Sequence, residues 1–275
     1  MVRIYTDVAA DNGLPAAVVW KNGELLYNLT DGSKYGFASS IYVHEGDVYV
    51  VGNEELGDNN ISNGTIWKNG VTYAILTDEL DVNERSVGDD IFVNETGIYI
   101  AGYEESEKHE NGTPKLWEDT TQNSLTDEEY HGRAYSVYAI GSDVYVAGYE
   151  ENDSGTSIAK YWKNGVVTNL SNDSQNAEAH SIFVVGEDVY VAGFYTIDFE
   201  TLEQAVVWKN GVPTNLGNAG SGAVSVYVYN QDVYVAGLEP QGEMANAAVW
   251  KNGSPMELEF SEGAGNSQIF SVFVR

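Results

Sequence analysis

Residues 179–216 read AHSIFVVGEDVYVAGFYTIDFETLEQAVVWKNGVPTNL, and this stretch decides the fold because its phrases recur along the whole chain. Tryptophan returns at intervals of 42 to 50 residues, and five of the six copies read Trp-Lys-Asn-Gly. The copies begin at Trp20, Trp67, Trp117, Trp162, Trp208 and Trp250. The exception is the third, which reads Trp117-Glu118-Asp119-Thr120. A fixed period of this length is typical of repeat architectures.

Two further phrases keep the same period and the same order. Phrases like DVYVAG occur at 47–52, 97–102, 143–148, 188–193 and 232–237. Phrases like SIFV occur at 40–43, 90–93, 136–139, 181–184, 225–228 and 271–274. Both are rich in β-branched and aromatic residues, which favour strands.

Each repeat contains four short segments, which we name strands A to D in chain order. In the quoted repeat we expect them at 179–185, 188–194, 204–209 and 212–216. Asn210-Gly211 between the last two is the preferred two-residue hairpin turn. Four strands per roughly 46 residues fit a propeller blade, with a linear solenoid as the alternative. The sequence therefore predicts an all-β, six-bladed β-propeller that forms a single domain over residues 1–275.

The two ends of the chain suggest how such a ring would close. The chain finishes on a strand A at 271–275 and begins with a strand B at 2–6, followed by strand C at 15–21 and strand D at 24–30. We therefore expect the termini to share one blade, which would cover two exposed strand edges. The five intact blades are expected to begin near residues 38, 88, 134, 179 and 223.

The loops place the expected binding site. The A–B and C–D turns are nearly identical among repeats, whereas the B–C and D–A loops vary in length and chemistry. Binding residues are commonly carried on such variable loops. We therefore expect a ligand at the channel mouth on the B–C/D–A face.

The residue before each strand A Ser should surround that mouth. This column reads Ser39, Asp89, Tyr135, His180, Val224 and Phe270. With charged neighbours, it supplies our candidate ligand-binding residues: Arg85, Asp89, Asp90, His131, Arg133, Tyr135, Glu178 and His180. A mouth that is part polar and part apolar suits a small polar ligand.

The recurring residues themselves have simpler interpretations. We expect each Trp and the Tyr of each Val-Tyr-Val to pack between blades, the Lys of Trp-Lys-Asn-Gly to be solvated, and the strand A Ser to bond backbone of a neighbouring blade. Surface positions are the default for His131 and His180, and loop salt bridges for Arg85 and Arg133. Neither a zinc pattern nor a calcium-loop pattern occurs, so we predict no metal and no cofactor.

Charge and composition restrict the partners. With 42 acidic and 13 basic residues the net charge is −29, which disfavours nucleic acid. Cysteine is absent, so disulfides are excluded. No apolar run is long enough for a membrane helix, and residues 1–9 lack a signal-peptide pattern. We expect a monomer.

The segments Ala17–Gly23, Ala179–Val184 and Asp188–Gly193 carry a resemblance that covers essentially the whole chain. They resemble uncharacterised secreted or lipid-anchored bacterial repeat proteins, many from Bacteroidetes, and are more loosely similar to the extracellular HAF-type repeat. The resemblance implies a propeller located extracellularly, in the periplasm or at the cell surface, and it supplies no catalytic residues. Trp117-Glu118-Asp119-Thr120 departs from the pattern, which puts a tight turn there in doubt.

Three functions follow as expectations, and the first is favoured over an enzyme. The first is a non-enzymatic binding or scaffold module for a glycan, peptide or small polar ligand. The second is a carbohydrate-active hydrolase or lyase at the same mouth, with Asp89, Asp90, His131, His180 and Tyr135 as candidates. Asp89-Asp90 with Glu84 offers the paired carboxylates that such an enzyme needs. The third is a purely structural repeat protein.

Overall fold

The computed structural model describes residues 2–8, 14–56, 61–76, 85–106, 112–197, 202–241, 244–259 and 267–274. These residues are all-β and contain no helix. Consecutive antiparallel strands form six sheets, five of four strands and one of three. The all-β class and the six propeller-type sheets are thereby confirmed. The chain divides into two compact units, residues 1–142 and 143–275, each described here by itself.

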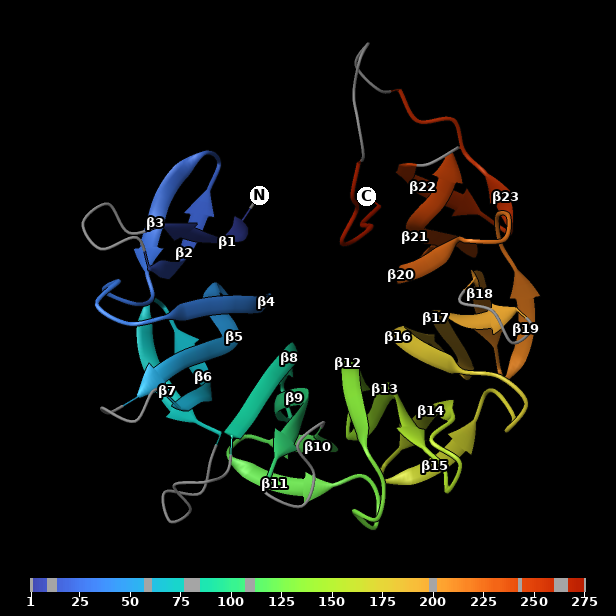
Figure 1. The fold of residues 1–275 in the computed structure, drawn as a ribbon. Helices are drawn as coiled ribbons and strands as arrows, with labels where there is room; N and C mark the ends of the chain where they lie inside the picture. Colours follow the sequence, from blue (N-terminus) through green and yellow to red (C-terminus); the bar gives the residue numbers. More distant parts are fainter. Residues whose placement is uncertain are drawn as a thin grey trace. The chain divides into compact units, whose positions relative to one another are not determined.

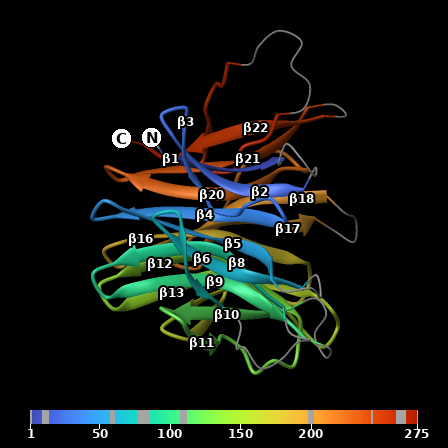
Figure 2. The ribbon, with the colours of Figure 1, turned by 90° about the vertical axis from the view of Figure 1, so that its left-hand side faces the viewer.

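The first unit contains β1 to β12. Its strands are β1 (Val2–Val8), β2 (Pro15–Lys21), β3 (Glu24–Asn28), β4 (Gly36–His44), β5 (Asp47–Leu56), β6 (Ile61–Lys68), β7 (Val71–Ile75), β8 (Arg85–Asn94), β9 (Gly97–Glu105), β10 (Thr113–Glu118), β11 (Thr121–Ser124) and β12 (Gly132–Ile140). Within this unit, β4, β8 and β12 lie side by side at the inner edges of successive sheets (Figure 1). Figure 2 shows β8, β9, β10 and β11 succeeding one another in a single sheet.

The second unit contains β13 to β23. Its strands are β13 (Asp143–Glu151), β14 (Ser157–Lys163), β15 (Val166–Asn169), β16 (Ala177–Val185), β17 (Asp188–Ile197), β18 (Leu202–Lys209), β19 (Val212–Asn215), β20 (Gly222–Tyr229), β21 (Asp232–Gln241), β22 (Met244–Lys251) and β23 (Ser254–Pro255). The predicted strands of the quoted repeat correspond to β16 to β19. The expected blade starts lie one to three residues after the first residues of β4, β8, β12, β16 and β20.

Ring closure by a shared blade stays a prediction. β1, β2 and β3 form a three-stranded sheet, as expected for strands B, C and D. The strand expected at 271–275 is not formed over the described residues 271–274, and Arg275 lies outside them. The prediction of one domain over 1–275 likewise stays a prediction.

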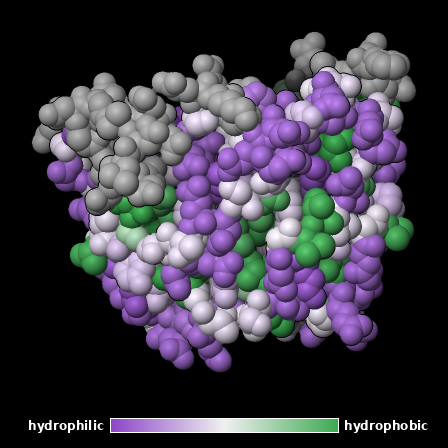
Figure 3. Space-filling model, turned by 90° about the horizontal axis from the view of Figure 1, so that it is seen from below, coloured by the Kyte–Doolittle hydropathy of each residue, from purple (hydrophilic) through white to green (hydrophobic). Residues whose placement is uncertain are grey.

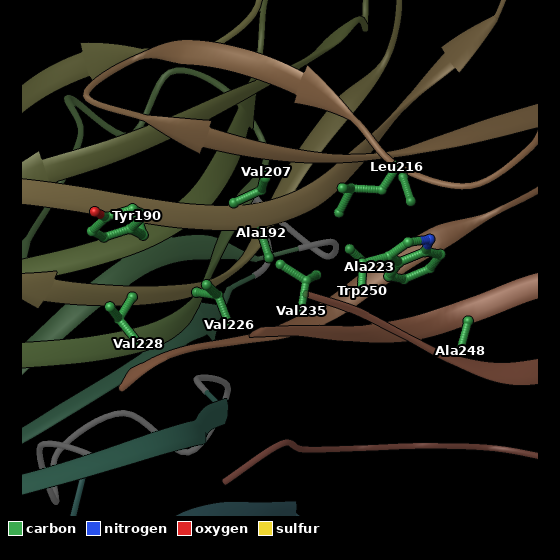
Figure 4. Packing of buried hydrophobic residues seen from close by; sticks show 11 residues of the cluster. Tyr190, Ala192, Val207, Leu216, Ala223, Val226, Val228, Val235, Ala248 and Trp250 are labelled. Carbon is green, nitrogen blue, oxygen red and sulfur yellow. The ribbon is translucent and has the colours of Figure 1, made fainter. Parts of the chain in front are cut away.

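Hydrophobic clusters between neighbouring sheets form the core. Trp67, Trp117, Trp162, Trp208 and Trp250 are buried, whereas Trp20 is partly exposed. In the second unit, Trp250 packs with Leu216 and Ala223 between the sheet of β16–β19 and the sheet of β20–β23 (Figure 4). In the first unit, Trp117 donates from Nε1 to the carbonyl oxygen of Leu76 at 2.9 Å. The expected packing of Trp between sheets is confirmed at these positions.

The sequence predicted that the Lys of Trp-Lys-Asn-Gly is solvated, but in four repeats this Lys forms an ion pair. Lys68 Nζ lies 2.8 Å from Asp47 Oδ2 and 4.9 Å from the centroid of the Tyr49 ring. Equivalent pairs join Lys163 to Asp143, Lys209 to Asp188 and Lys251 to Asp232. The Lys therefore folds back over the Tyr of its own sheet and meets the Asp that begins the adjacent strand.

The Asn of each repeat docks the C–D turn onto the same strand. Asn69 Oδ1 accepts from the Val48 amide at 2.9 Å, and its Nδ2 donates to Asp47 Oδ1 at 2.8 Å. Asn69 has φ +51°, in the left-handed region that Asn tolerates. The pattern recurs at Asn164, Asn210 and Asn252.

The doubt about a tight turn after Trp117 is removed. β10 and β11 are separated by only two residues, and Asp119 adopts φ +56° there. Its Oδ1 accepts from the Ile98 amide at 3.1 Å, as the Asn does elsewhere. In this sheet Gly97 and Glu118 stand where other repeats have Asp and Lys, so both members of the ion pair are replaced together.

Among the coloured residues in Figure 3, many are hydrophilic, and the hydrophobic ones form small separate groups. Of the residues that the structure describes, none lies in a helix long and apolar enough to cross a membrane.

Candidate functional site

A β-bulge in the innermost strand of several sheets creates the column predicted to surround the site. The register of β8 against β9 shifts between Gly88 and Asp90, which leaves Asp89 without a partner residue. The same register shift occurs at Ser39 on β4, at His180 on β16 and at Val224 on β20. Bulges re-aim a side chain and are over-represented next to active sites. They give this column its distinct direction.

The Gly of four DVYVAG-like phrases is required by the bulge. A Cβ on Gly102 would lie 1.9 Å from the carbonyl oxygen of Val87, far inside van der Waals contact. Gly52, Gly193 and Gly237 face a carbonyl oxygen at 2.0 Å in the same way. The recurring Gly therefore marks the place where strand A crosses closely over strand B.

Ser181 of the strand A column bonds the backbone of the next sheet, as predicted. Its Oγ accepts from the Val226 amide of β20 at 3.1 Å. Ser225 Oγ accepts from the Val272 amide at 3.2 Å, in a segment that belongs to no sheet. Asp90 replaces Ser in this column and accepts more hydrogen bonds than the Ser residues do. It accepts from the Val137 amide and Ser136 Oγ, both at 3.0 Å, and from Ser40 Oγ at 2.7 Å. Asp90 thus joins β4, β8 and β12.

These contacts make Asp90 a structural residue rather than a free acid. Burial raises the pKa of Asp90, and the hydrogen bonds from Ser40, Val137 and Ser136 oppose that shift. Its oxygens accept those bonds and one from the Ile91 amide at 2.9 Å. A carboxylate used in this way is poorly placed to donate a proton to a substrate.

Asp89 is held differently from Asp90. Its Oδ2 is buried and has no hydrogen-bond partner among the described residues. Burial raises the pKa of Asp89 to about 7, with Arg133 lowering it and Asp90 raising it. A carboxyl with this pKa is partly protonated at neutral pH, so it is able to act as a general acid.

Tyr103 lies at the centre of the same cluster. The Arg133 guanidinium carbon is 4.3 Å from the centroid of the Tyr103 ring. Burial raises the pKa of Tyr103, and charges on Arg133, Asp89, Glu105 and Arg85 also act on it. Arg85 pairs with Glu105 at 3.2 Å, so the expected salt bridge forms, but between the ends of β8 and β9 rather than in a loop.

The cluster lies at the end of the sheet where β8 begins and β9 ends, and therefore beside the B–C and D–A loops. His131 and Tyr135 are partly buried and flank Arg133 along the chain. Glu84 lies outside the described residues. The structure therefore brings together Arg85, Asp89, Asp90 and Arg133 of the predicted set.

Glu178 and His180 belong to the second unit and form a separate cluster. His180 Nε2 is 3.2 Å from Glu178 Oε2, and its ring meets Phe194 edge-on with centroids 5.3 Å apart. Burial raises the pKa of Glu203, with His180 lowering it and Glu178 raising it.

Sequence reasoning missed Tyr103, Glu105, Phe194, Glu203 and Lys115. Tyr103 and Phe194 directly follow the recurring Gly, so their position in the repeat was an available signal. Lys115 is buried and bonds Ser124 Oγ at 2.9 Å, Glu104 at 3.3 Å and Glu128. Lys160 and Glu150 pair at the same register in β14 and β13, where Lys160 likewise faces the recurring Gly.

Within the described ranges, no group of three His, Asp or Glu side chains is arranged to hold a metal ion.

Comparison with known proteins supports the fold and little else. No family model matches the chain, and no curated protein matches it. It is similar to a thermostable family-43 glycoside hydrolase, with 12% identity, TM-score 0.45 and coverage of 84% of this chain and 96% of the other. It is also similar to a puromycin-hydrolyzing peptidase from Mycobacterium tuberculosis, with 12% identity and TM-score 0.54. That match covers 82% of this chain and 38% of the peptidase.

A third similar structure is a triple mutant of AofleA from Arthrobotrys oligospora, with 12% identity and TM-score 0.50. It covers 99% of this chain and 89% of the other. At such identities a likeness shows the fold alone.

The first functional expectation is contradicted by these names. We expected a non-enzymatic binding or scaffold module, whereas several of the similar structures are family-43 glycoside hydrolases. That activity belongs to those proteins. Activity of this chain is therefore taken up as a proposal.

Proposed function

We propose that the chain is a carbohydrate-active hydrolase in which Asp89 is the general acid. The observation that carries this is the state of Asp89: a pKa of about 7 and a buried Oδ2 without a hydrogen-bond partner in the described part of the chain. Hydrolysis of a glycoside needs an acid that is still protonated near neutral pH.

The chemistry assigns a second role to a carboxylate. The Asp89 proton passes to the glycosidic oxygen as the bond to the anomeric carbon breaks. A water molecule adds its hydroxyl to that carbon and gives its proton to a base. Glu105 is our candidate base, because it belongs to the same cluster and Arg85 holds its carboxylate at 3.2 Å. Asp90 is occupied by its bonds to three strands.

Arg133 and Tyr103 shape the site around the acid. The guanidinium lies over the phenol ring in a cation–π contact. The positive charge of Arg133 limits how far burial raises the Asp89 pKa. We propose that the pair also orients sugar hydroxyls, because both side chains offer hydrogen-bond donors.

Leaving-group dependence tests the acid. Aryl glycosides with poor and good leaving groups, covering pentoses and hexoses, are assayed with the wild type and Asp89→Asn. We expect Asp89→Asn to lose at least about a hundredfold in kcat on poor leaving groups, which need protonation, and far less on good ones. The alkaline limb of the wild-type pH profile, expected near pH 7, should disappear in the variant.

Tyr229→Phe is the control, because this exposed side chain ends β20 and is not a member of the cluster. Turnover that is unchanged in Asp89→Asn contradicts the proposal, as does the absence of turnover across the whole panel.

We also propose a location outside the cytoplasm, supported by the resemblance to secreted repeat proteins. Fractionation of the source cells with an antibody against the chain tests it.

A further inference from the structure

The repeats allow the surroundings of two aromatic residues to be compared position by position. Tyr103 and Phe194 each follow the recurring Gly, and each lies on the second strand of its sheet. Tyr103 is only 6% exposed, whereas Phe194 is partly exposed. Two side-chain replacements account for this difference.

Two residues cover Tyr103. Arg133 lies over the ring at 4.3 Å, and Gly112 comes so close that a Cβ there would be 2.5 Å from Tyr103 Cδ2. Register places Glu203 where the first cluster has Gly112, since Gln204 pairs with Tyr195 as Thr113 pairs with Glu104.

Gly222 stands where the first cluster has Arg133, because each lies three residues before the strand A Ser of the following sheet. Beside Phe194, the carboxylate of Glu203 therefore takes the place of Gly112, and Gly222 takes the place of Arg133.

The exchange removes a cation and adds an anion. Within 4 Å of the place where a Cβ of Gly222 would lie, Glu203 Oε2 at 3.1 Å is the one heavy atom among the described residues. Glu178 adds a second carboxylate that acts electrostatically on Glu203. His180 contacts the Phe194 ring at its edge. An aromatic ring and carboxylates thus belong to the cluster in which Gly222 takes the position that Arg133 takes in the Tyr103 cluster.

We propose that Phe194, Glu203 and Gly222 form a binding site for an organic cation, with a ligand guanidinium taking the place that Arg133 takes over Tyr103. A guanidinium can stack on an aromatic face and pair with a carboxylate, so one ligand group could contact both the Phe194 ring and the Glu203 carboxylate. The net charge of −29 attracts cations from a distance. The site lies in the second unit and does not depend on the hydrolase proposal.

L-Arginine amide, L-citrulline amide and L-lysine amide are titrated into the full chain by calorimetry at low salt. All three carry the same α-amino group, so arginine against citrulline isolates the guanidinium. We expect arginine amide to bind with a dissociation constant near the millimolar range, at least about tenfold more tightly than citrulline amide. Binding should weaken as salt is added. Lysine amide should bind less well than arginine amide because its ammonium does not stack as a plane.

Three substitutions test the residues. Gly222→Arg supplies the cation from the chain itself and should abolish binding. Glu203→Gln and Phe194→Leu should each weaken it about tenfold. Glu187→Gln is the matched control, because it removes the same charge in the exposed β16–β17 turn at the other end of this hairpin, and it should bind as the wild type does. Circular dichroism of each variant confirms that it is folded.

Equal binding of citrulline and arginine amides overturns the proposal, as does no measurable binding of arginine amide. Undiminished binding by folded Gly222→Arg or Glu203→Gln does the same. Because the readout is binding, failure here leaves the Asp89 experiment unaffected, and loss of hydrolysis in Asp89→Asn leaves this site unaffected.

Discussion

Gly102 faces the carbonyl oxygen of Val87 so closely that a Cβ on Gly102 would stand 1.9 Å from that oxygen. This approach occurs at the bulge that directs Asp89 away from the ladder. The same bulge therefore explains both why Gly is needed at position 102 and why the Asp89 side chain is directed out of the ladder.

Gly102→Ala is expected to destabilise the fold by about 3 kcal/mol, because backbone on both sides must move to admit one methyl group. Urea unfolding followed by tryptophan fluorescence measures this. Gly97→Ala on the same strand is the control, since its Cβ would meet only the flexible Asp119 carboxylate at 3.3 Å. Similar unfolding free energies for the two variants would contradict the bulge argument.

Asp90→Ala should cost about 3 kcal/mol or more, because it leaves two hydroxyls and two amides without their acceptor. Asp90→Ser should recover part of the loss, since Ser181 and Ser225 perform the amide contact in other sheets. Chemical denaturation of the three proteins checks the order wild type, Asp90→Ser, Asp90→Ala. If Asp90→Ala is as stable as the wild type, the carboxylate does not join the strands as described.

Asp89 should make stability depend on pH. Its folded pKa of about 7 exceeds the unfolded value of about 3.9, so the folded state binds more protons between these values. The contribution of Asp89 to stability is therefore lost as pH rises from about 4 to about 7. Asp89→Asn should match the wild type at pH 4 and exceed it at pH 8, by up to about 4 kcal/mol.

Urea unfolding at both pH values measures the difference, and comparing the variant with the wild type cancels the general effect of the acidic chain. A constant difference between pH 4 and pH 8 would mean that Asp89 has an ordinary pKa.

Lys68→Ala and Asn69→Ala should differ although the residues are adjacent. The Lys68–Asp47 pair is exposed, and such pairs contribute little, so the unfolding midpoint should hardly move. Asn69→Ala removes the acceptor for the Val48 amide and places Ala at φ +51°, which should cost about 1–2 kcal/mol. Denaturation curves recorded side by side check this, and an effect of Lys68→Ala as large as that of Asn69→Ala would refute it.

Much of the fold was predictable from particular positions. The strands at 188–194 and 204–209, the Asn210-Gly211 turn and the buried Trp positions all follow from period and residue type. The tight turn at Asp119 was not, because Asp takes the left-handed conformation without the Gly that usually signals it. The Lys68–Asp47 pair was also missed, since its members lie 21 residues apart in sequence.

For the candidate site, the sequence identified the column of residues before each strand A Ser, but not which of its carboxyl groups are held by hydrogen bonds. Asp89 and Asp90 are adjacent and identical in type, yet one carboxylate is tied to Ser40, Ser136 and Val137 while the other keeps a buried oxygen without a partner. Tyr103 and Arg133 stand 30 residues apart and meet only because β12 packs against β9.

Period, turn residues and the alternation of apolar side chains are local properties, so the residues alone established repeating four-stranded sheets and the positions of their turns. Protonation state, stacking and the space left beside Gly222 depend on which side chains from distant segments approach one another. Burial and long-range charge set those properties, and both arise only when the sheets pack together.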